Sequence, residues 1–288
     1  MADQVFDVAV IGAGPAGLSA ATTARVRNKS VALFEHLDFS PKLQKAHTIN
    51  NYPGLPNMAG KDLMKQISDH CMALGPTLIK EKVLTVFPGE TFTLLTPNNT
   101  YEAKTVILSI GVVSSARLPG EKELTGRGVC YCATCDGMLY RDKIVAVVGY
   151  TEESEHEADF LGEICKTVYF LPQYKTEYQP KHSNIEVKNA RAQSIKGEQE
   201  VTALVTDAGE LTVDGVFVLR LSDPPENLLP ELEMDGTFVK VDRDQATNVA
   251  GVYAAGDCTG KHWQIARAVG EGQVAILSAI NYLATHKK

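Results

Sequence analysis

The stretch Gly12-Ala13-Gly14-Pro15-Ala16-Gly17 decides the fold that we expect for this chain of 288 residues. It follows a short apolar run, Asp7 to Ile11, that is suited to a buried strand, and it begins a helical pattern that ends at Arg27. In such a strand–turn–helix, the first glycine permits the tight turn, the second lets a diphosphate approach the backbone, and the third allows close helix–strand packing. The amide groups and dipole at the start of the helix favour the negative charge of a diphosphate.

An acidic residue completes this pattern. Glu35 ends the next apolar run, Ser30 to Phe34, and stands 18 residues after Gly17, where a carboxylate can bind ribose hydroxyls. Together these features predict a Rossmann-like dinucleotide-binding unit, but they do not distinguish FAD from NAD.

Strand and helix patterns alternate along the rest of the chain. A second strand–helix–strand unit begins at Lys143 to Gly149, with Thr167 to Leu171 as its next strand. Gly251 to Ala255 is expected to be another strand, and Gln264 to Leu283 a long terminal helix. Alternating strands and helices predict an α/β fold with parallel sheets and right-handed crossovers.

Composition and charge exclude several classes of protein. The formal net charge is −7, which argues against binding to nucleic acid through its phosphates. The longest apolar runs, such as Thr105 to Val113, fall short of the ~20 residues that span a bilayer, so we expect no membrane association. The first residues show no basic and apolar export segment, and six cysteines are too few for a secreted fold held by disulfides. We therefore expect a cytoplasmic protein.

The segment Thr247 to Asp257 resembles the T-x(4)-G-[VI]-[YF]-A-x-G-D signature of flavoproteins with two dinucleotide-binding domains. The resemblance implies that FAD is the cofactor, that Gly256 and Asp257 contact it, and that the aspartate binds its ribityl chain. It also implies that the next helix points its N-terminus at the flavin, where it would stabilise the negative charge of the reduced ring. The implied fold has two Rossmann-like domains, with the central one inserted into the FAD domain.

A second chemical motif, Cys132-Ala133-Thr134-Cys135, lies near the centre of the chain. A Cys-x-x-Cys pair can close a small disulfide ring, accept two electrons and exchange with an external disulfide. The alternative is half of a zinc site, but zinc needs four ligands. The chain has no second such pair and its histidines are scattered, although Cys130 could add a third thiolate. We expect no metal, and we interpret the isolated cysteines as small buried hydrophobic residues.

The longer string Cys132 to Gly137 is similar to the C-A-T-C-D-G signature of bacterial-type, low-molecular-weight thioredoxin reductases. Likewise, Asn51-Tyr52-Pro53-Gly54 resembles the N-[WYF]-P-G stretch that lies near the flavin ring in that family, and the resemblance covers nearly the whole chain. It implies that Cys132 and Cys135 form a redox disulfide and that Asp136 shuttles a thiol proton. It also implies that thioredoxin is the partner and that the protein is a homodimer.

The chain departs from that family where NADPH should bind. The family has a second G-x-G-x-x-A/G motif, whereas here Gly149 keeps the first glycine and Thr151 and Ser154 replace the other small residues. Carboxylates that would repel a pyrophosphate crowd the following turns: Glu152, Glu153, Glu155, Glu157 and Asp159. The H-R-R cluster that grips the 2′-phosphate in the family is replaced by Pro172-Gln173-Tyr174, with only Lys175 cationic.

This pattern resembles ferredoxin-dependent flavin thioredoxin reductases, which keep FAD and the C-A-T-C motif but lack the NADPH motifs. The resemblance implies that reduced ferredoxin supplies the electrons. Two alternatives stay open. One is an NADPH-dependent thioredoxin reductase with an atypical nucleotide site. The other is a redox-sensing flavoprotein whose cysteine pair only reports the redox state and does not reduce a substrate.

We expect residues 1–113 and 244–288 to form the FAD-binding domain and residues 114–243 to form the central domain with the redox cysteines. The central segment has 14 Lys and Arg against 23 Asp and Glu, a net charge of −9, and the rest of the chain has +2. Because ferredoxins are acidic, the FAD domain is the expected docking surface. Its basic residues include Lys42, Lys45, Lys61 and Lys65. The two crossings, Gly111 to Ser114 and Arg243 to Ala246, are the expected hinges.

The only tryptophan stands where the family has an arginine. In Lys261-His262-Trp263-Gln264, the glutamine and the later Gly270-x-Gly272 match the family's R-Q-A…G-x-G run. We expect Trp263, Gln264 and Ile265 to lie at the flavin, with the indole stacking on or shielding the ring. Ordinary packing of the indole is the alternative.

Overall fold

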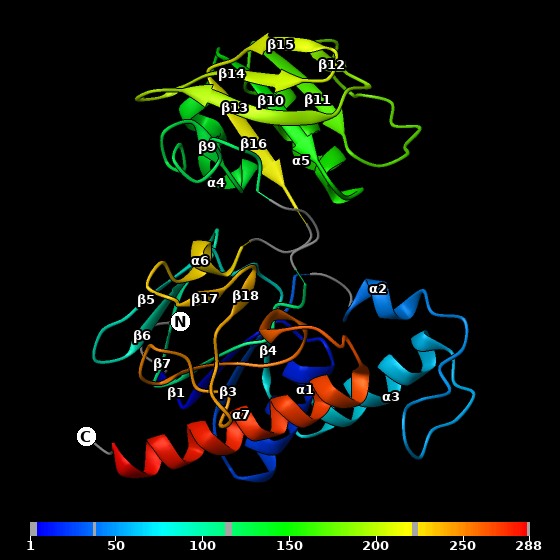
Figure 1. Cartoon of the computed structure of the whole chain (residues 1–288), viewed down its shortest axis with the longest axis vertical. Coiled ribbons are helices and arrows are strands. Elements are labelled where there is room, and N and C mark those ends of the chain that lie inside the picture. The colour runs from blue at the N-terminus through cyan, green and yellow to red at the C-terminus, as the bar shows by residue number, and fades with distance from the viewer. Residues whose placement is uncertain (1–4, 37–38, 113–116, 221–223, 287–288) are drawn as a thin grey trace. The chain divides into compact units, whose positions relative to one another are not determined.

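Figure 1 shows the computed structural model of the chain, which describes residues 5–36, 39–112, 117–220 and 224–286. The chain folds into two compact units. The first unit consists of residues 1–112 and 224–288, and the second consists of residues 113–223. The second unit is therefore an insertion into the first.

A parallel five-stranded sheet forms the centre of the first unit, with the strand order β19-β8-β2-β3-β4. Its strands are β2 (Val8–Ile11), β3 (Val31–Phe34), β4 (Thr77–Ile79), β8 (Val106–Leu108) and β19 (Val252–Ala254). All four residues of β2 are apolar and buried, as expected for a parallel strand that is covered on both faces. The predicted parallel α/β architecture is confirmed.

Different partners cover the two faces of this sheet. Val8 and Val10 on one face belong to a core cluster with helices α1 (Pro15–Val26), α3 (Gly60–Ala73) and α7 (Ile265–Thr285). Ala9 and Ile11 on the other face share a core with a second sheet, of strand order β1-β7-β6-β5. The strands of that sheet are β1 (Val5–Phe6), β5 (Thr85–Phe87), β6 (Phe92–Leu95) and β7 (Thr100–Ala103).

The remaining elements of the first unit are short. They are the helices α2 (Pro41–Gln44) and α6 (Pro225–Leu228), the 3-10 helix η2 (Asp257–Thr259), and the paired strands β17 (Met234–Asp235) and β18 (Phe238–Val239).

The second unit ends at residue 223 rather than at the predicted residue 243. The physical reason is that Leu228, Leu229, Leu232 and Val239 are buried in the core of the first unit, against the second sheet. The predicted crossing at residues 243–246 is instead a turn inside the first unit, in which the Ala246 N–H donates to the Asp242 carboxylate at 2.9 Å. The other predicted crossing is Gly111 to Ser114, and its residues 113 and 114 lie outside the described residues.

This boundary changes the distribution of charge. Counted over the two units of the structure, the second has 12 Lys and Arg against 18 Asp and Glu, a net charge of −6. The first unit has 16 Lys and Arg against 17 Asp and Glu, a net charge of −1. The second unit is the more acidic one, but the net positive charge expected for the first is wrong.

A parallel sheet with the strand order β12-β11-β10-β16-β9 forms the centre of the second unit. Its strands are β9 (Val129–Cys130), β10 (Ile144–Gly149), β11 (Thr167–Pro172), β12 (Ile185–Val187) and β16 (Gly215–Leu219). An antiparallel sheet completes the unit with β13 (Ala192–Gly197), β14 (Val201–Thr206) and β15 (Gly209–Thr212). Its helices are α4 (Ala133–Asp136), α5 (Glu153–Gly162) and the 3-10 helix η1 (Gly137–Tyr140).

None of the helices in the described part of the chain is both long enough and apolar enough to cross a membrane.

Candidate flavin and disulfide sites

The first glycine motif turns from β2 into α1. Gly12 has a φ of +98°, and a Cβ built on it would lie 2.5 Å from the Ser109 carbonyl oxygen. A Cβ on Gly17 would lie 1.9 Å from the carbonyl oxygen of Gly12. Packing inside the unit therefore requires both glycines, as the sequence pattern predicts.

Gly14 differs from these two glycines. Its φ of −73° is open to any residue, and no heavy atom beyond its chain neighbours lies within 4 Å of a Cβ built on it. Gly14 is the N-cap of α1, with Pro15 and Ala16 following, and this first turn has neither a capping side chain nor an acidic residue. The first amides of α1 are thus free of a competing carboxylate, and an anion can approach the backbone at Gly14.

Glu35 lies beside this loop. It is only 8% exposed, and its Oε2 accepts a hydrogen bond from the Ala13 N–H at 3.0 Å. The register of β2 and β3 produces this contact, because Ile11 pairs with Phe34 and so the two strand ends are level. The predicted neighbours therefore meet at one edge of the sheet.

The C-terminal signature packs against the start of α1. Gly256 has a φ of +83°, and its Cβ would lie 2.9 Å from the Ala16 Cβ. A Cβ on Gly272 in α7 would lie 2.1 Å from the Ala16 carbonyl oxygen. Sequence reasoning missed Glu271, which accepts a hydrogen bond from the Gly256 N–H at 2.9 Å and pairs with Arg267 at 2.6 Å.

Two predicted flavin contacts that are far apart in the sequence also meet. The Asn51 side-chain amide donates to Gln264 Oε1 at 2.7 Å, across 213 residues of chain. Gln264 is the N-cap of α7, and the first turn of this helix, which begins at Ile265, has no acidic residue. Trp263 is 48% exposed, and the partly buried Asp257 begins η2. The amides at the start of α7 therefore offer a second place for negative charge.

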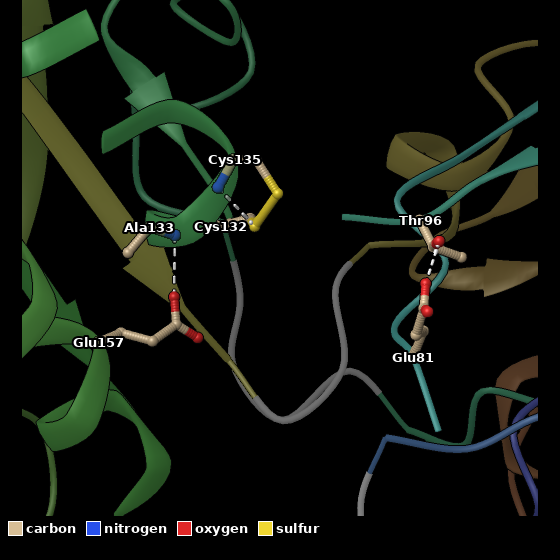
Figure 2. The surroundings of a disulfide bond; sticks show 6 residues. All are labelled: Glu81, Thr96, Cys132, Ala133, Cys135 and Glu157. Carbon is tan, nitrogen blue, oxygen red and sulfur yellow. Dashed lines mark hydrogen bonds between the residues drawn. A yellow bond between two sulfur atoms is a disulfide. The ribbon is translucent and has the colours of Figure 1, made fainter. Parts of the chain in front are cut away.

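The structure joins Cys132 and Cys135 in a disulfide, with their Cα atoms 5.4 Å apart (Figure 2). Cys132 is the N-cap of α4, and its Sγ accepts a hydrogen bond from the Cys135 N–H at 3.2 Å (Figure 2). The Ala133 N–H donates to the Glu157 carboxylate of α5 at 2.9 Å (Figure 2). Glu157 was grouped by sequence reasoning with the carboxylates that repel a nucleotide, whereas here it fixes the first turn of α4.

Asp136 is half-buried at the end of α4. Burial raises the pKa of its carboxyl, while a hydrogen bond from the Cys130 thiol lowers it to a smaller extent. The Cys130 Sγ lies 3.5 Å from the Tyr140 hydroxyl. Asp136 follows Cys135 directly in the sequence, and its raised pKa means that the carboxyl holds a proton to higher pH than an exposed aspartate does.

The second glycine motif is filled by the chain's own side chains. A Cβ on Gly149 would lie 2.1 Å from the Oγ of Ser154, which is fully buried. The Ser154 hydroxyl donates to the Thr151 carbonyl oxygen at 2.5 Å. The Ser154 side chain is therefore part of the close packing between α5 and β10, at the position where the family motif has glycine or alanine.

An arginine that sequence reasoning missed also occupies this region. The guanidinium of Arg220, at the end of β16, lies 5.1 Å from the centre of the Tyr150 ring. It donates two hydrogen bonds to Glu121 at 2.7 and 2.8 Å, and both side chains are fully buried. This arginine is therefore paired with a carboxylate, and it lies over Tyr150 in the loop that follows β10.

A cavity of about 820 Å³ lies beside the first turn of α5. It is lined by Glu152, Glu155, Tyr174, Lys175, Thr176, Glu177, Tyr178 and Asn189. Glu155 Oε1 accepts hydrogen bonds from the hydroxyls of Tyr174 at 2.9 Å and Thr176 at 2.5 Å. The cavity thus has three carboxylates and a single lysine, which is a poor environment for a phosphate.

The remaining cysteines of the described chain, Cys71, Cys130, Cys165 and Cys258, are buried free thiols. Within the described residues, no three His, Cys, Asp or Glu side chains are grouped so that they could hold a metal ion.

Comparison with known proteins identifies the family. A family model described as pyridine nucleotide-disulphide oxidoreductase matches residues 6–272. The thioredoxin reductase of Peptoclostridium litorale is 32% identical, over 98% of each chain. A ferredoxin-flavin thioredoxin reductase from Clostridium acetobutylicum is 43% identical, with 99% of each chain covered and a TM-score of 0.94. An atypical thioredoxin reductase from Desulfovibrio vulgaris Hildenborough is 28% identical, with 98% and 99% covered and a TM-score of 0.67.

The family match, the parallel folds of both units and the Cys132–Cys135 disulfide agree with one another. The loop at Gly14 and the uncharged start of α1 fit the diphosphate of FAD, the cofactor of thioredoxin reductases in this family. The chain belongs to the pyridine nucleotide-disulphide oxidoreductase family and is a thioredoxin reductase of the FAD-containing type.

Proposed function

We propose that this thioredoxin reductase takes its electrons from reduced ferredoxin rather than from NADPH. In this proposal the electrons pass through FAD and the Cys132–Cys135 disulfide to thioredoxin. The observation that carries the proposal is the second glycine motif, where Thr151 replaces the glycine that a diphosphate approaches, α5 begins with carboxylates and Arg220 lies over Tyr150.

A dinucleotide needs free amides at a helix N-terminus. The first turn of α5 carries Glu153 and Glu155, and its N-cap is Glu152, so carboxylates already interact with the helix dipole there. Burying a pyrophosphate beside these charges is unfavourable without paired cations. Arg220, which lies over Tyr150 of this loop, is already paired with Glu121.

A similar protein supports the same donor. The Clostridium acetobutylicum structure is described as a ferredoxin-flavin thioredoxin reductase, and it matches 99% of this chain. A one-electron carrier needs no nucleotide pocket, so the loss of the NADPH motifs does not hinder it.

The residues that would hold FAD lie in the first unit. We assign the diphosphate to Gly12, Gly14 and the amides of α1, the ribose to Glu35, and the flavin end to Asp257 and Gln264. A bound flavin supplies two electrons and can be loaded one electron at a time.

The disulfide step requires two electrons and two protons. As the Cys132–Cys135 bond breaks, each sulfur receives one electron, and Asp136 gives its proton to one of the two thiolates. One thiolate then attacks the disulfide of thioredoxin, so a mixed disulfide forms and one thioredoxin thiolate leaves. The second cysteine loses its proton to Asp136 and displaces the other thioredoxin sulfur, which restores the Cys132–Cys135 bond. Asp136 thereby regains the proton that it gave, and the two thioredoxin thiolates take up two protons from water.

An apolar surface next to the disulfide suits a protein substrate. Met138 and Leu139 follow the motif directly and are 56% and 69% exposed, respectively. Large exposed hydrophobic side chains beside a reactive group typically mark a protein contact. We assign this surface to thioredoxin.

For ferredoxin we propose a small docking surface formed by a few lysines, because the first unit as a whole has no net positive charge. The Gly60 N–H donates to the Ala46 carbonyl oxygen at 2.8 Å, so these two stretches of backbone lie side by side. Lys45 and Lys61, the neighbours of these two residues, are both exposed. Lys65 is already paired with Asp69 at 2.6 Å. The side chain of Lys42 lies outside the described residues.

Anaerobic stopped-flow absorbance tests the donor. The flavin of the purified protein is mixed with reduced ferredoxin, NADPH or NADH, each with oxidised thioredoxin present. We expect rapid bleaching and thioredoxin reduction with ferredoxin only. Rapid bleaching by micromolar NADPH would contradict the proposal and favour an NADPH enzyme with an atypical site. Bleaching by ferredoxin without any thioredoxin reduction would favour a redox sensor.

We further propose a cytoplasmic homodimer. The free thiols Cys71, Cys130, Cys165 and Cys258 fit a reducing compartment. The dimer follows from the resemblance to thioredoxin reductases, and sedimentation velocity of the holoenzyme tests it.

A further inference from the structure

The loop between β19 and α7 carries the two residues that we assign to the flavin end of FAD. Asp257 lies near its start, and Gln264 ends it as the N-cap of α7. Two side chains of α7 that have no part in the scheme above reach back to this loop. They are Arg267 and Glu271, whose side chains are 26% and 17% exposed, respectively.

Glu271 holds the start of the loop. Its Oε2 accepts hydrogen bonds from the Gly256 N–H at 2.9 Å and from the Thr259 hydroxyl at 3.0 Å. Gly256 is buried, so without the carboxylate its N–H would lose a partner that water does not readily replace. The carboxylate therefore ties the backbone directly before Asp257 to the helix.

Arg267 holds the rest of the loop. Its Nη1 donates to the carbonyl oxygens of Gly260 and Lys261, each at 2.8 Å. Its Nη2 donates to the Thr259 hydroxyl at 2.9 Å, and its Nε lies 2.6 Å from Glu271 Oε1. One guanidinium thus connects three consecutive loop residues with α7, which the planar fork of an arginine can do and a lysine cannot.

The placement of this pair does not suit the helix itself. Arg267 is the third residue of α7, where the helix dipole disfavours a positive charge. Glu271 follows it by four residues, and an acidic residue after a basic one is the weaker orientation of a helical ion pair. Helix stability therefore does not explain the pair, whereas its bonds to the loop do.

We propose that Arg267 and Glu271 are positioning residues for FAD, which hold residues 256–261 in the shape that receives the flavin end of the cofactor. This inference rests on the proposed assignment of Asp257 and Gln264 to that end of FAD. It does not depend on whether ferredoxin or NADPH supplies the electrons.

The test follows the release of FAD from the holoenzyme. The protein is diluted into buffer, and release is measured as the rise in the fluorescence of free FAD. Arg267→Met keeps the aliphatic stem and loses the bonds to the loop, so it should release FAD about tenfold faster than the wild type. Glu271→Gln keeps an acceptor for the Gly256 N–H, so its release should be slower than that of Glu271→Leu.

The only tryptophan of the chain gives a second readout, because Trp263 stands two residues after Lys261. Time-resolved fluorescence anisotropy of the holoenzyme should show faster local rotation of this indole in Arg267→Met. Lys104→Met is the matched control, since it also breaks a partly buried ion pair of the first unit, with Asp7 at 3.1 Å. It should release FAD and rotate Trp263 as the wild type does.

Asp257→Leu separates the inference from the assignment on which it rests. If Asp257→Leu releases FAD rapidly but Arg267→Met behaves like the wild type, the positioning role is refuted and the assignment stands. If Asp257→Leu keeps the wild-type rate, the assignment fails first. Equal acceleration in Lys104→Met would also refute the inference. If Arg267→Met does not fold, Arg267→Lys replaces it, and a wild-type release rate in that variant refutes the inference.

Discussion

Replacing Gly14 by valine should separate folding of the first unit from FAD binding. The backbone at Gly14 is extended, with a φ of −73° and a ψ of −176°, which valine adopts without strain. A Cβ at this position meets no heavy atom within 4 Å beyond its chain neighbours, so the protein itself has room for the side chain. The valine methyl groups would stand at the start of α1, where the diphosphate is expected to approach the backbone.

The expected change in unfolding free energy has opposite signs in the apo protein and in the FAD-loaded protein. A glycine replaced at a compatible position loses freedom in the unfolded chain, so apo Gly14→Ala should gain about 0.4–1 kcal/mol of unfolding free energy. A ligand present at 100 times its Kd stabilises the folded state by about 2.7 kcal/mol. A variant that cannot bind FAD loses this contribution. Without FAD, Gly14→Val should therefore unfold at the same or a slightly higher denaturant concentration than the wild type. With FAD present, it should unfold at a lower denaturant concentration than the wild type.

Urea unfolding of the apo and FAD-loaded forms, together with the flavin absorbance of the purified protein, measures both effects. Gly270→Ala is the matched control, because Gly270 also has no atom within 4 Å of a built Cβ but lies beyond the first turn of α7. It should keep its flavin. Gly17→Ala is the opposite control, since its Cβ would lie 1.9 Å from the Gly12 carbonyl oxygen, and it should destabilise both forms. A folded Gly14→Val protein with a full complement of FAD would refute the reasoning.

Three further predictions concern the electron path. Cys132→Ser and Cys135→Ser should each stop thioredoxin reduction while the flavin stays reducible by ferredoxin. One of the two variants should form a mixed disulfide with a single-cysteine thioredoxin, visible on a non-reducing gel, and normal turnover in either variant would exclude that cysteine from the electron path. Lys45→Glu should lower kcat/KM for ferredoxin several-fold at low salt and much less at high salt, whereas Arg27→Glu, at the far end of α1, should not; equal effects would exclude the proposed docking surface. Leu139→Ser should raise KM for thioredoxin about tenfold without changing flavin reduction, and an unchanged KM would remove this side chain from the interface.

The parts of the site that could be predicted are those encoded by neighbours in the sequence. The glycine loop, the Cys-x-x-Cys pair and the strand that ends at Glu35 each depend on a few consecutive residues and on strand register. Backbone geometry requires particular residue types at particular spacings in such local motifs, so the motifs can be recognised in the sequence. The two-unit α/β fold followed from them.

The parts that could not be predicted depend on contacts between distant residues. Glu121 and Arg220 are 99 residues apart and meet only when β16 lies beside the loop after the first crossing. The bond between Asn51 and Gln264 spans 213 residues, and only the resemblance to a known family, which placed both residues at the flavin, brought them together in advance. The second domain boundary was predicted wrongly for the same reason. The apolar residues between Leu228 and Val239 are buried in the core of the first unit, but their sequence does not tell which of the two cores buries them.

The two glycine motifs of this chain allow a comparison within one molecule. Both follow a buried parallel strand and lead into a helix, but the two turns differ in backbone as well as in side chains. Gly14, the N-cap of α1, is extended with a ψ of −176°, whereas Glu152, the N-cap of α5, is helical with a ψ of −28°. In the first, Gly14 is open and α1 begins without an acidic residue. In the second, Thr151 stands at the position of Gly14 and α5 begins with carboxylates. Because a carboxylate at a helix N-terminus stabilises the helix as an anionic ligand would, the second unit can keep its fold without a nucleotide. The carboxylates at the start of α5 therefore stabilise this helix as an anionic ligand would, in the same unit that carries the Cys132–Cys135 disulfide.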